Sequence, residues 1–373
     1  GQAVIAAGIV VGGLGVMTLA SILGFAVSRH LGLTQRMLAT QETGTGAMGQ
    51  ISLLLKAVIA TSLTMQALLA AVFLPRFLSM GIDPVRAVWD AVFMAISVFN
   101  NAGFVILPEG LSPHVTDWWM LIPIILGTTV GAIGFPVIMD VAKNLRAPRR
   151  WRLHTKLTLS TYLILAFVGA LALALTEWNN PATLGAIDTP SKILNAMLAG
   201  VNSRSSGLSA LDVGAMQTQT HFVQDILMMI GGGSASTAGG VKVTTFAVLV
   251  LAVIAEARGD RDIETFGRRI PTSAVRLAVA VSLLGLALVA VSVVLLLSMT
   301  HYSLDIILFE TASAFATVGL STGITPVLPV GAKYVLIFLM FAGRTGSMTV
   351  AAALALRERS RVIRMPEERP IIG

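Results

Sequence analysis

Long apolar runs alternate with polar loops along most of the chain. About 20 helical residues cross the hydrocarbon core of a bilayer, and runs of that order occur seven times, at residues 3–27, 51–74, 118–141, 157–175, 222–255, 277–299 and 334–356. The pattern therefore predicts an all-α integral membrane protein with seven spans.

Three of the segments that connect these spans contain a short apolar stretch of helical character, at residues 85–97, 193–201 and 304–315. Apolar helices of about 10 to 14 residues are too short to cross a bilayer and suggest re-entrant or buried elements. Each short helix is followed by small residues that end in glycine and a large apolar residue. The repeated order is span, re-entrant helix, glycine stretch and span.

The glycine stretches are the most informative part of the sequence. They read Asn101-Ala102-Gly103, Ser205-Ser206-Gly207 and Thr317-Val318-Gly319, with glycines 104 and 112 residues apart. Non-helical backbone at membrane depth occurs only where it is buried in protein or lines a water-filled cavity. Its carbonyl groups can replace the water shell of a potassium ion, and glycine permits the required backbone geometry. We therefore predict an ion-binding selectivity filter, with ordinary glycine turns as the alternative.

A second glycine pattern recurs in the spans that follow. It reads Gly12-Gly13-Leu14-Gly15, Gly131-Ala132-Ile133-Gly134 and Gly343-Arg344-Thr345-Gly346, and each copy places two glycines three residues apart inside a predicted helix. Small residues at this spacing allow close helix packing in membranes. A lone arginine within a span is costly unless it faces a cavity or a partner. We therefore expect Arg344 in the ion pathway, just below the filter.

The predicted span at residues 222–255 is interrupted by a run rich in glycine. Five glycines among ten residues destabilise a regular helix, since each costs about 1 kcal/mol relative to alanine. The phosphate-binding pattern with a terminal Gly-Lys-Ser/Thr is absent, and no strand precedes the run. We expect an intramembrane gating loop, with Lys242 either anchoring its cytoplasmic end or snorkelling. The predicted gate comprises Gly231, Gly232, Gly233, Ser234, Ala235, Ser236, Thr237, Ala238, Gly239, Gly240, Lys242 and Arg344.

Composition and charge agree with a membrane location. The chain is 55% hydrophobic and 12% charged, with a mean hydropathy of +0.82, whereas soluble domains carry about 25% charged residues. Most of the 26 lysines and arginines lie in loops on one side of the predicted topology, which by the positive-inside rule is cytoplasmic and includes the C-terminus. The net charge of +7 therefore indicates orientation rather than a nucleic-acid partner.

Several other kinds of site have no support in the sequence. The chain has no cysteine, which excludes disulfides and thiol sites. Its five histidines are scattered without ligand spacing, so no transition metal is expected, and no acid, base and nucleophile gather as in an enzyme. Three acidic residues near the re-entrant segments, Asp90, Asp305 and Glu310, either attract cations to the pore mouth or cap helices. Arg204 is expected to brace the second glycine stretch through carbonyl groups or a neighbouring acid.

These motifs together resemble the Trk/Ktr/HKT superfamily of potassium transporters. The similarity rests on residues 99–104, 203–208, 231–240 and 343–346, and the runs at 242–246 and 346–349 are most similar to the bacterial KtrB-type membrane subunits. The resemblance implies potassium uptake across the cell membrane by repeated span, pore loop, span (M1-P-M2) units in a pseudo-fourfold, potassium-channel-like arrangement. It also implies a homodimer, a cytoplasmic nucleotide-binding regulatory subunit of the KtrA/TrkA type, and contact with lipid. No cofactor is expected beyond the transported K⁺, with Na⁺ as a candidate activator.

The expected units divide the chain into four parts. Residues 1–46 hold the second span of unit one, whose first span and pore loop are missing; residues 47–150 form unit two, residues 151–258 unit three with its broken second span, and residues 259–373 unit four with a cytoplasmic tail. Since the family has four filter strands, we expect a truncated pore. The alternative is a secondary cation-coupled transporter with a discontinuous-helix substrate site at residues 231–240. Units that repeat in the same orientation favour the pore.

Overall fold

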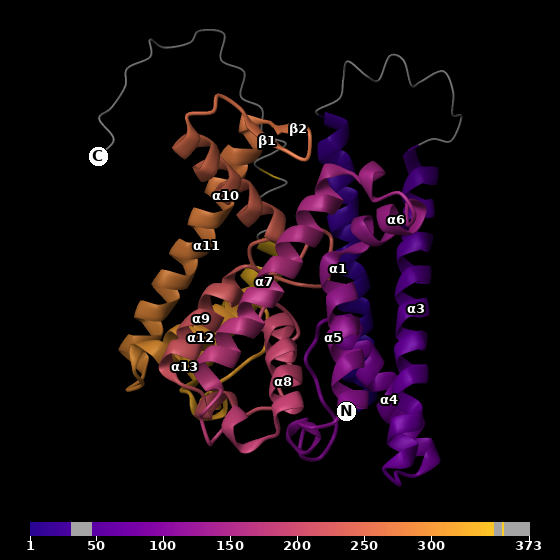
Figure 1. Cartoon of the computed structure of the whole chain (residues 1–373), viewed down its shortest axis with the longest axis vertical. Coiled ribbons are helices and arrows are strands. Elements are labelled where there is room, and N and C mark those ends of the chain that lie inside the picture. Colours follow the sequence, from indigo (N-terminus) through magenta and orange to yellow (C-terminus); the bar gives the residue numbers. More distant parts are fainter. Residues whose placement is uncertain (31–46, 347–352, 354–373) are drawn as a thin grey trace.

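Long helices form the frame of the molecule. The computed structural model describes residues 1–30, 47–346 and 353 of the chain. Within those residues four helices are long and apolar enough to cross a membrane. These are α1 (Gln2–His30), α3 (Ala47–Ser79), α7 (Leu153–Glu177) and α11 (Thr272–Met299), and they run along the long axis of the molecule (Figure 1). Each of them matches one of the apolar runs of the sequence.

A short helix follows each of α3, α7 and α11. These are α4 (Pro84–Phe99), α8 (Thr189–Asn202) and α12 (Leu304–Ala316), and they confirm the three short helices predicted from the sequence. Asp83 and Asp188 cap α4 and α8 by accepting hydrogen bonds from backbone N–H groups of the first turn. The three short helices contribute to three clusters of buried apolar side chains, two of which combine residues from two short helices, so all three helices lie in the interior of the molecule.

The helices that follow the glycine stretches are all interrupted. The predicted continuous span at residues 118–141 is wrong, because α5 (Trp118–Ile133) and α6 (Phe135–Lys143) meet at an angle of 97°. Gly134, at φ +91°, separates them. Pro136 in the first turn of α6 has no N–H to donate to Ala132, four residues earlier, so a continuous helix would lose that hydrogen bond. Counting this bent pair as one span gives five candidate spans among the described residues, against seven predicted.

The other two interruptions agree better with the sequence. The predicted break in the span at residues 222–255 is confirmed, since α9 (Thr218–Met229) and α10 (Val243–Arg258) are separate helices. Helix α13 (Val330–Phe341) continues as a π-helix, Ala342–Gly346, rather than as the predicted α-helix. The remainder of the predicted span at residues 334–356 lies outside the described residues except for residue 353.

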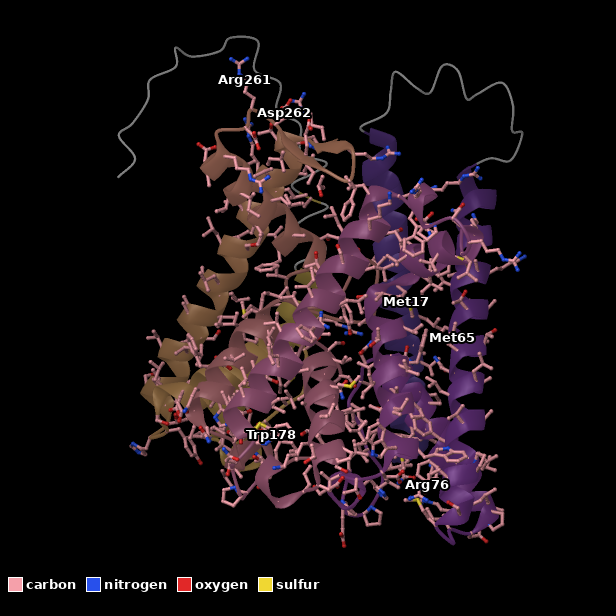
Figure 2. The ribbon with its side chains drawn as sticks, viewed as in Figure 1. Met17, Met65, Arg76, Trp178, Arg261 and Asp262 are labelled. Carbon is pink, nitrogen blue, oxygen red and sulfur yellow. The ribbon has the colours of Figure 1, made fainter. Side chains whose placement is uncertain are left out.

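Short elements connect the long helices. The 3₁₀ helices are Ser112–His114, Pro148–Arg150, Leu184–Ala186, Val213–Ala215 and Thr325–Val327. Strands β1 (Ile263–Thr265) and β2 (Arg268–Ile270) pair antiparallel between α10 and α11, with Phe266 and Gly267 at positive φ in the two-residue turn. Figure 2 shows Arg261 and Asp262 beside this hairpin at one end of the molecule, and Arg76 and Trp178 towards the other end.

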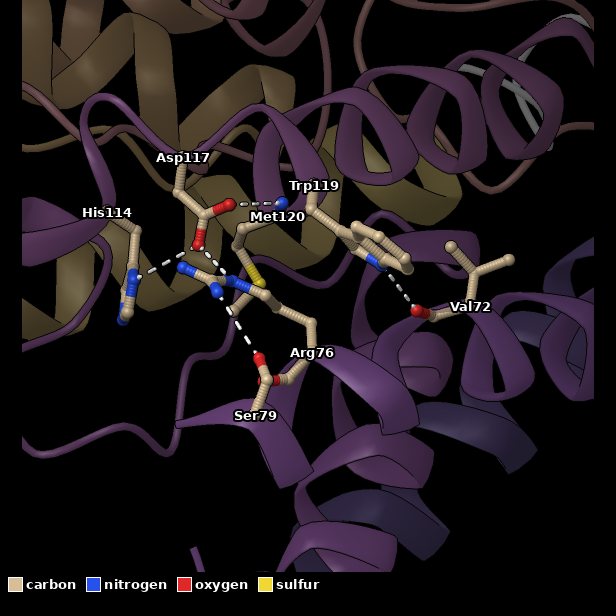
Figure 3. Close-up of polar contacts among 7 residues, drawn as sticks. All are labelled: Val72, Arg76, Ser79, His114, Asp117, Trp119 and Met120. Atoms are coloured by element: carbon tan, nitrogen blue, oxygen red, sulfur yellow. Dashed lines mark hydrogen bonds and ion pairs between the residues drawn. The ribbon is translucent and has the colours of Figure 1, made fainter. Parts of the chain in front are cut away.

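An ion pair fixes the two helices that enclose α4. Arg76 near the end of α3 donates from Nε to Asp117 at 2.7 Å (Figure 3). Asp117 also caps α5 by accepting a bond of 3.1 Å from the N–H of Met120, and the indole of Trp119 donates to the carbonyl of Val72 at 3.0 Å. These bonds hold α3 to the start of α5 at this end of the molecule, and α4 packs against both helices in one apolar cluster.

Candidate functional site

The three short helices end in the same backbone turn. In each, the backbone N–H of the residue two positions before the filter glycine donates a hydrogen bond to a backbone carbonyl. That carbonyl belongs to the residue five positions before the same glycine. The three bonds are Asn101 to Val98 at 3.2 Å, Ser205 to Asn202 at 3.2 Å and Thr317 to Ala314 at 3.1 Å. Segments more than 100 residues apart thus share this turn at the ends of the three short helices.

The glycine stretches adopt an unusual backbone conformation. Gly103, Gly207 and Gly319 have φ of +74°, +62° and +99°. In the first and third stretches Asn101 and Thr317 have φ of +52° and the residue before the glycine has negative φ, whereas in the second stretch Ser206, directly before Gly207, has φ of +78°. Positive φ at two of the three residues in each stretch departs from the β-strand pattern, in which successive groups point to opposite sides. A β-branched residue such as Thr317 rarely has positive φ, and such strain is concentrated at functional sites.

The three stretches converge on one place. A β-carbon at Gly103 would collide with the carbonyl oxygen of Ser206, and one at Gly207 would collide with that of Val318. A β-carbon at Gly319 would lie 3.9 Å from the Ser206 oxygen. The backbone carbonyls of the second and third stretches therefore lie beside their neighbours' glycines. The nine predicted filter residues are thus brought together in space.

Polar side chains of the short helices hold the backbone just beyond the glycines. Asn202 of α8 donates to the carbonyl of Leu208 at 2.8 Å, and Ser313 of α12 donates to that of Leu320 at 2.6 Å. Both donors are buried. The sequence reasoning did not identify them, although a polar residue five or six positions before each glycine is a signal that it could have used.

Glu310 braces the chain after the third stretch. This buried carboxylate accepts bonds of 2.8 to 2.9 Å from the hydroxyls of Ser321, Thr322 and Thr325 and from the N–H of Thr322. Asp90 instead pairs with Arg86 on its own helix at 2.9 Å. Glu310 therefore has the contacts of a structural carboxylate, which holds the chain that follows the third glycine stretch.

Arg204 lies behind the second stretch, fully buried. Its guanidinium is 3.7 Å from the centre of the Tyr162 ring, and its Nε donates to the carbonyl of Gly200 at 3.5 Å. A cation stacked on an aromatic ring is favourable when both are desolvated. That carbonyl belongs to its own helix α8, so the bracing of the second glycine stretch through carbonyl groups stays a prediction, and the stacking partner on α7 was not predicted.

The glycine loop, residues 231–240, packs against the break between α5 and α6. The break leaves two carbonyl groups at the end of α5 without helical partners, and both accept hydrogen bonds from the loop. The carbonyl of Ala132 accepts from the N–H of Gly233 at 2.8 Å, and the carbonyl of Gly131 accepts from the N–H of Thr237 at 3.3 Å. In return the N–H of Phe135 donates to Ala235 at 3.3 Å. Apart from half-buried Ser234, the loop residues are buried. The two interrupted helices therefore satisfy each other's backbone groups.

Both basic residues of the predicted gate, Lys242 and Arg344, contact this loop. Lys242 donates from Nζ to the carbonyl of Ala238 at 2.6 Å, which is an anchoring contact rather than snorkelling. Arg344, in the π-helix, donates from a terminal guanidinium nitrogen to the carbonyl of Thr237. The loop also approaches the third stretch, since a β-carbon at Gly239 would lie 2.8 Å from the carbonyl oxygen of Ala316. The residues predicted as a gate are thus one cluster next to the predicted filter.

Two of the Gly-x-x-Gly motifs make equivalent contacts. A β-carbon at Gly131 would collide with the carbonyl oxygen of Phe99, and one at Gly343 would collide with that of Phe315. Phe99 and Phe315 both lie four residues before a glycine of the filter stretches. In these two places the helix after a glycine stretch therefore approaches the end of the preceding short helix at a glycine. This agrees with the close packing predicted for the motif.

Comparison with known proteins identifies the family. Residues 1–363 match the family model described as TrkH: Cation transport protein. The chain belongs to this family. The expected resemblance is confirmed, and so is the expectation of a transporter rather than an enzyme.

Curated relatives cover the whole chain. It is 36% identical over 373 residues to the Ktr system potassium uptake protein B of Bacillus subtilis strain 168, covering all of this chain and 83% of the relative. It is 32% identical to the protein of the same name from Vibrio alginolyticus, over 97% of this chain and 80% of that one. The potassium/sodium uptake protein NtpJ of Enterococcus hirae is 31% identical, over 100% and 83%.

A solved structure shares the fold. The crystal structure of the potassium transporter TrkH from Vibrio parahaemolyticus superposes with a TM-score of 0.66 at 17% sequence identity, covering 92% of this chain and 69% of that one. The arrangement of helices is therefore that of a TrkH-type membrane protein.

Proposed function

We propose that the protein is a channel-like subunit for potassium uptake. The observation that carries this proposal is the convergence of three glycine stretches at one place, with a carbonyl oxygen of one beside a glycine of the next. Backbone carbonyls that converge in this way can replace the water around a potassium ion. Two curated relatives are named potassium uptake proteins and a third a potassium/sodium uptake protein, which supports the same ion.

The proposed architecture is a pseudo-fourfold pore built from M1-P-M2 units. Residues 47–150, 151–258 and 259–373 each supply one unit, and residues 1–46 supply the second span of another. The shared turn at the ends of α4, α8 and α12 supports this division. In this arrangement seven spans are present, and the K⁺ sites lie at residues 101–103, 205–207 and 317–319.

The proposed gate is the glycine loop with Lys242 and Arg344. The loop packs beside two filter stretches, and Arg344 reaches it from the fourth unit, so a closed loop would obstruct the ion pathway. The discontinuous helices also suit a secondary transporter, the alternative considered from the sequence. Here, however, the carbonyls and N–H groups at the breaks bond to each other, which favours a gate over an open substrate site.

Orientation and partners are further parts of the proposal. We place the protein in the cell membrane as a multi-pass subunit with α10, the hairpin and the C-terminus in the cytoplasm, because Arg258, Arg261, Arg268 and Arg269 gather there. A homodimer and a cytoplasmic nucleotide-binding subunit of the KtrA/TrkA type complete the expected assembly, with Na⁺ as a candidate activator.

The filter is tested by Gly319→Ser in proteoliposomes, with K⁺ and Na⁺ uptake measured separately. Space exists for the side chain, since a β-carbon would meet no atom closer than 3.9 Å, so the change acts on the left-handed backbone. We expect K⁺/Na⁺ discrimination to fall by roughly tenfold, the factor that corresponds to about 1.4 kcal/mol of backbone strain.

Gly81→Ser is the matched control. Gly81 has φ of +75° and open space around it, in the loop between α3 and α4, so it bears the same strain away from the filter. Discrimination should match the wild type there. Unchanged discrimination in folded Gly319→Ser protein would refute the filter assignment.

A further inference from the structure

Thr237 is the most connected residue of the glycine loop. Its side chain is fully buried, and its hydroxyl donates to the carbonyl of Gly131 at 3.0 Å while accepting from the side-chain amide of Asn101 at 2.6 Å. Its N–H also bonds Gly131, and its carbonyl accepts from Arg344. One residue thus joins the loop to the first glycine stretch, to the end of α5 and to the fourth unit.

The bond to Asn101 reaches the filter through a side chain. Asn101 is the first residue of its glycine stretch, is buried, and has φ of +52°, a conformation that asparagine tolerates better than most residues. Its amide fixes a backbone whose next two residues are Ala102 and Gly103. The loop contacts the third stretch in a different way, without a side-chain hydrogen bond from the loop. Gly239 has no side chain and packs closely against Ala316 and Thr317.

We propose that Thr237 is a positioning residue of the filter: through Asn101 it holds the first glycine stretch, so that ion discrimination depends on where the glycine loop lies. The inference rests on the proposed filter and gate. A buried donor that loses its partner carries a free-energy penalty. When the loop withdraws, the Asn101 amide loses its acceptor, and the first stretch has to relax with it.

The experiment measures K⁺/Na⁺ discrimination in proteoliposomes for Thr237→Val, which keeps the shape and removes the hydroxyl. We expect a fall of roughly fivefold, the change that one neutral hydrogen bond carries. Thr237→Ser, which restores the hydroxyl, should stay within about twofold of the wild type. Thr311→Val is the matched control, because that threonine is equally buried and donates only to carbonyls of its own helix α12. Its discrimination should be that of the wild type.

A double-mutant cycle separates positioning from general damage. Asn101→Gly accepts the positive φ, keeps the backbone carbonyl and removes the amide. In that background Thr237→Val should change discrimination no further, since the partner is already absent. A double variant that loses discrimination by the product of the two single effects would overturn the inference, as would wild-type discrimination in Thr237→Val.

The cycle also distinguishes this inference from the proposed function. Equal K⁺ and Na⁺ uptake by the wild type would overturn both. A potassium-selective wild type with an equally selective Thr237→Val overturns the positioning role alone. Should Thr237→Val fail to fold, Thr237→Ala takes its place in the cycle: a fall in discrimination that is absent in the Asn101→Gly background supports the inference, and an unchanged value refutes it.

Discussion

Arg344 and Lys242 both donate to carbonyls of the glycine loop, but they come from different helices, the π-helix after α13 and the start of α10. Lys242 lies at the end of the loop itself, whereas Arg344 reaches Thr237 from the π-helix that follows α13. An arginine placed in an apolar run requires a polar partner. The loop carbonyl supplies that partner, and the arginine in turn holds the loop.

Arg344→Gln should release the loop. A hydrogen bond to a charged group contributes about 1.5 to 3 kcal/mol, so its loss should raise the rate of K⁺ flux by roughly tenfold or more. Flux is measured in proteoliposomes at matched protein content. Arg269→Gln in the hairpin is the control, because its pair with Asp262 is solvent-exposed and contributes little. Wild-type flux in folded Arg344→Gln protein would contradict a role for this arginine in holding the gate.

Residue types explain what the sequence could and could not predict at this scale. Arg344 was identified from its cost in a span, and Gly103, Gly207 and Gly319 from their repetition. Thr237 lies in the predicted gate, but its role depends on a partner far away in the chain, and Asn202 and Ser313 were missed because polar residues of their type are common in membrane helices. Only the packing of distant units shows that Thr237 meets Asn101, 136 residues earlier.

Glycine motifs of the same form give different helices in this protein. Gly12-Gly13-Leu14-Gly15 lies inside the unbroken α1, whereas Gly131-Ala132-Ile133-Gly134 ends α5. The difference comes from Pro136, two residues past Gly134, which cannot complete the helical bond to Ala132. Apolar periodicity therefore predicted where α5 lies but not where it ends. The end of α5 depends on a distant contact, because the Ala132 carbonyl accepts its hydrogen bond from Gly233, about 100 residues later in the chain.

Deleting residues 234–238 should open the pathway further than any single change. The deletion removes Thr237 with its bonds to Asn101, Gly131 and Arg344, as well as the Ala235 carbonyl that accepts from Phe135. We expect K⁺ flux to exceed that of Arg344→Gln. Size-exclusion profiles establish that the deletion protein is folded. A folded protein whose flux is equal to or below the wild type would show that the loop does not obstruct the ion.

At the scale of the whole molecule, the described residues expose many large apolar side chains and bury several charged and polar ones. Large apolar side chains such as Phe167, Leu175, Leu283 and Val294 are exposed on α7 and α11, while Arg204, Glu310 and Thr237 are buried. Soluble proteins show the opposite tendency for charged residues. The distribution suits helices that face lipid around a polar pathway, with the hairpin at one end and the loop after α7 at the other.

Orientation can be tested because the chain has no cysteine. Single cysteines at exposed Arg261, beside the hairpin, and at exposed Ala182, after α7, report the two ends of the molecule. A membrane-impermeant thiol reagent should label Ala182→Cys in intact cells and Arg261→Cys only after the membrane is opened. The cysteine-free parent controls for background labelling. The reverse pattern would invert the proposed topology.

The glycine loop holds five glycines in one buried conformation. Glycine loses more backbone freedom than any other residue when it is ordered. Release of the loop therefore exchanges hydrogen bonds, an enthalpic loss, for a large gain in conformational entropy. Warming favours the released loop for this reason, and so acts on it in the same direction as removing one of its hydrogen bonds.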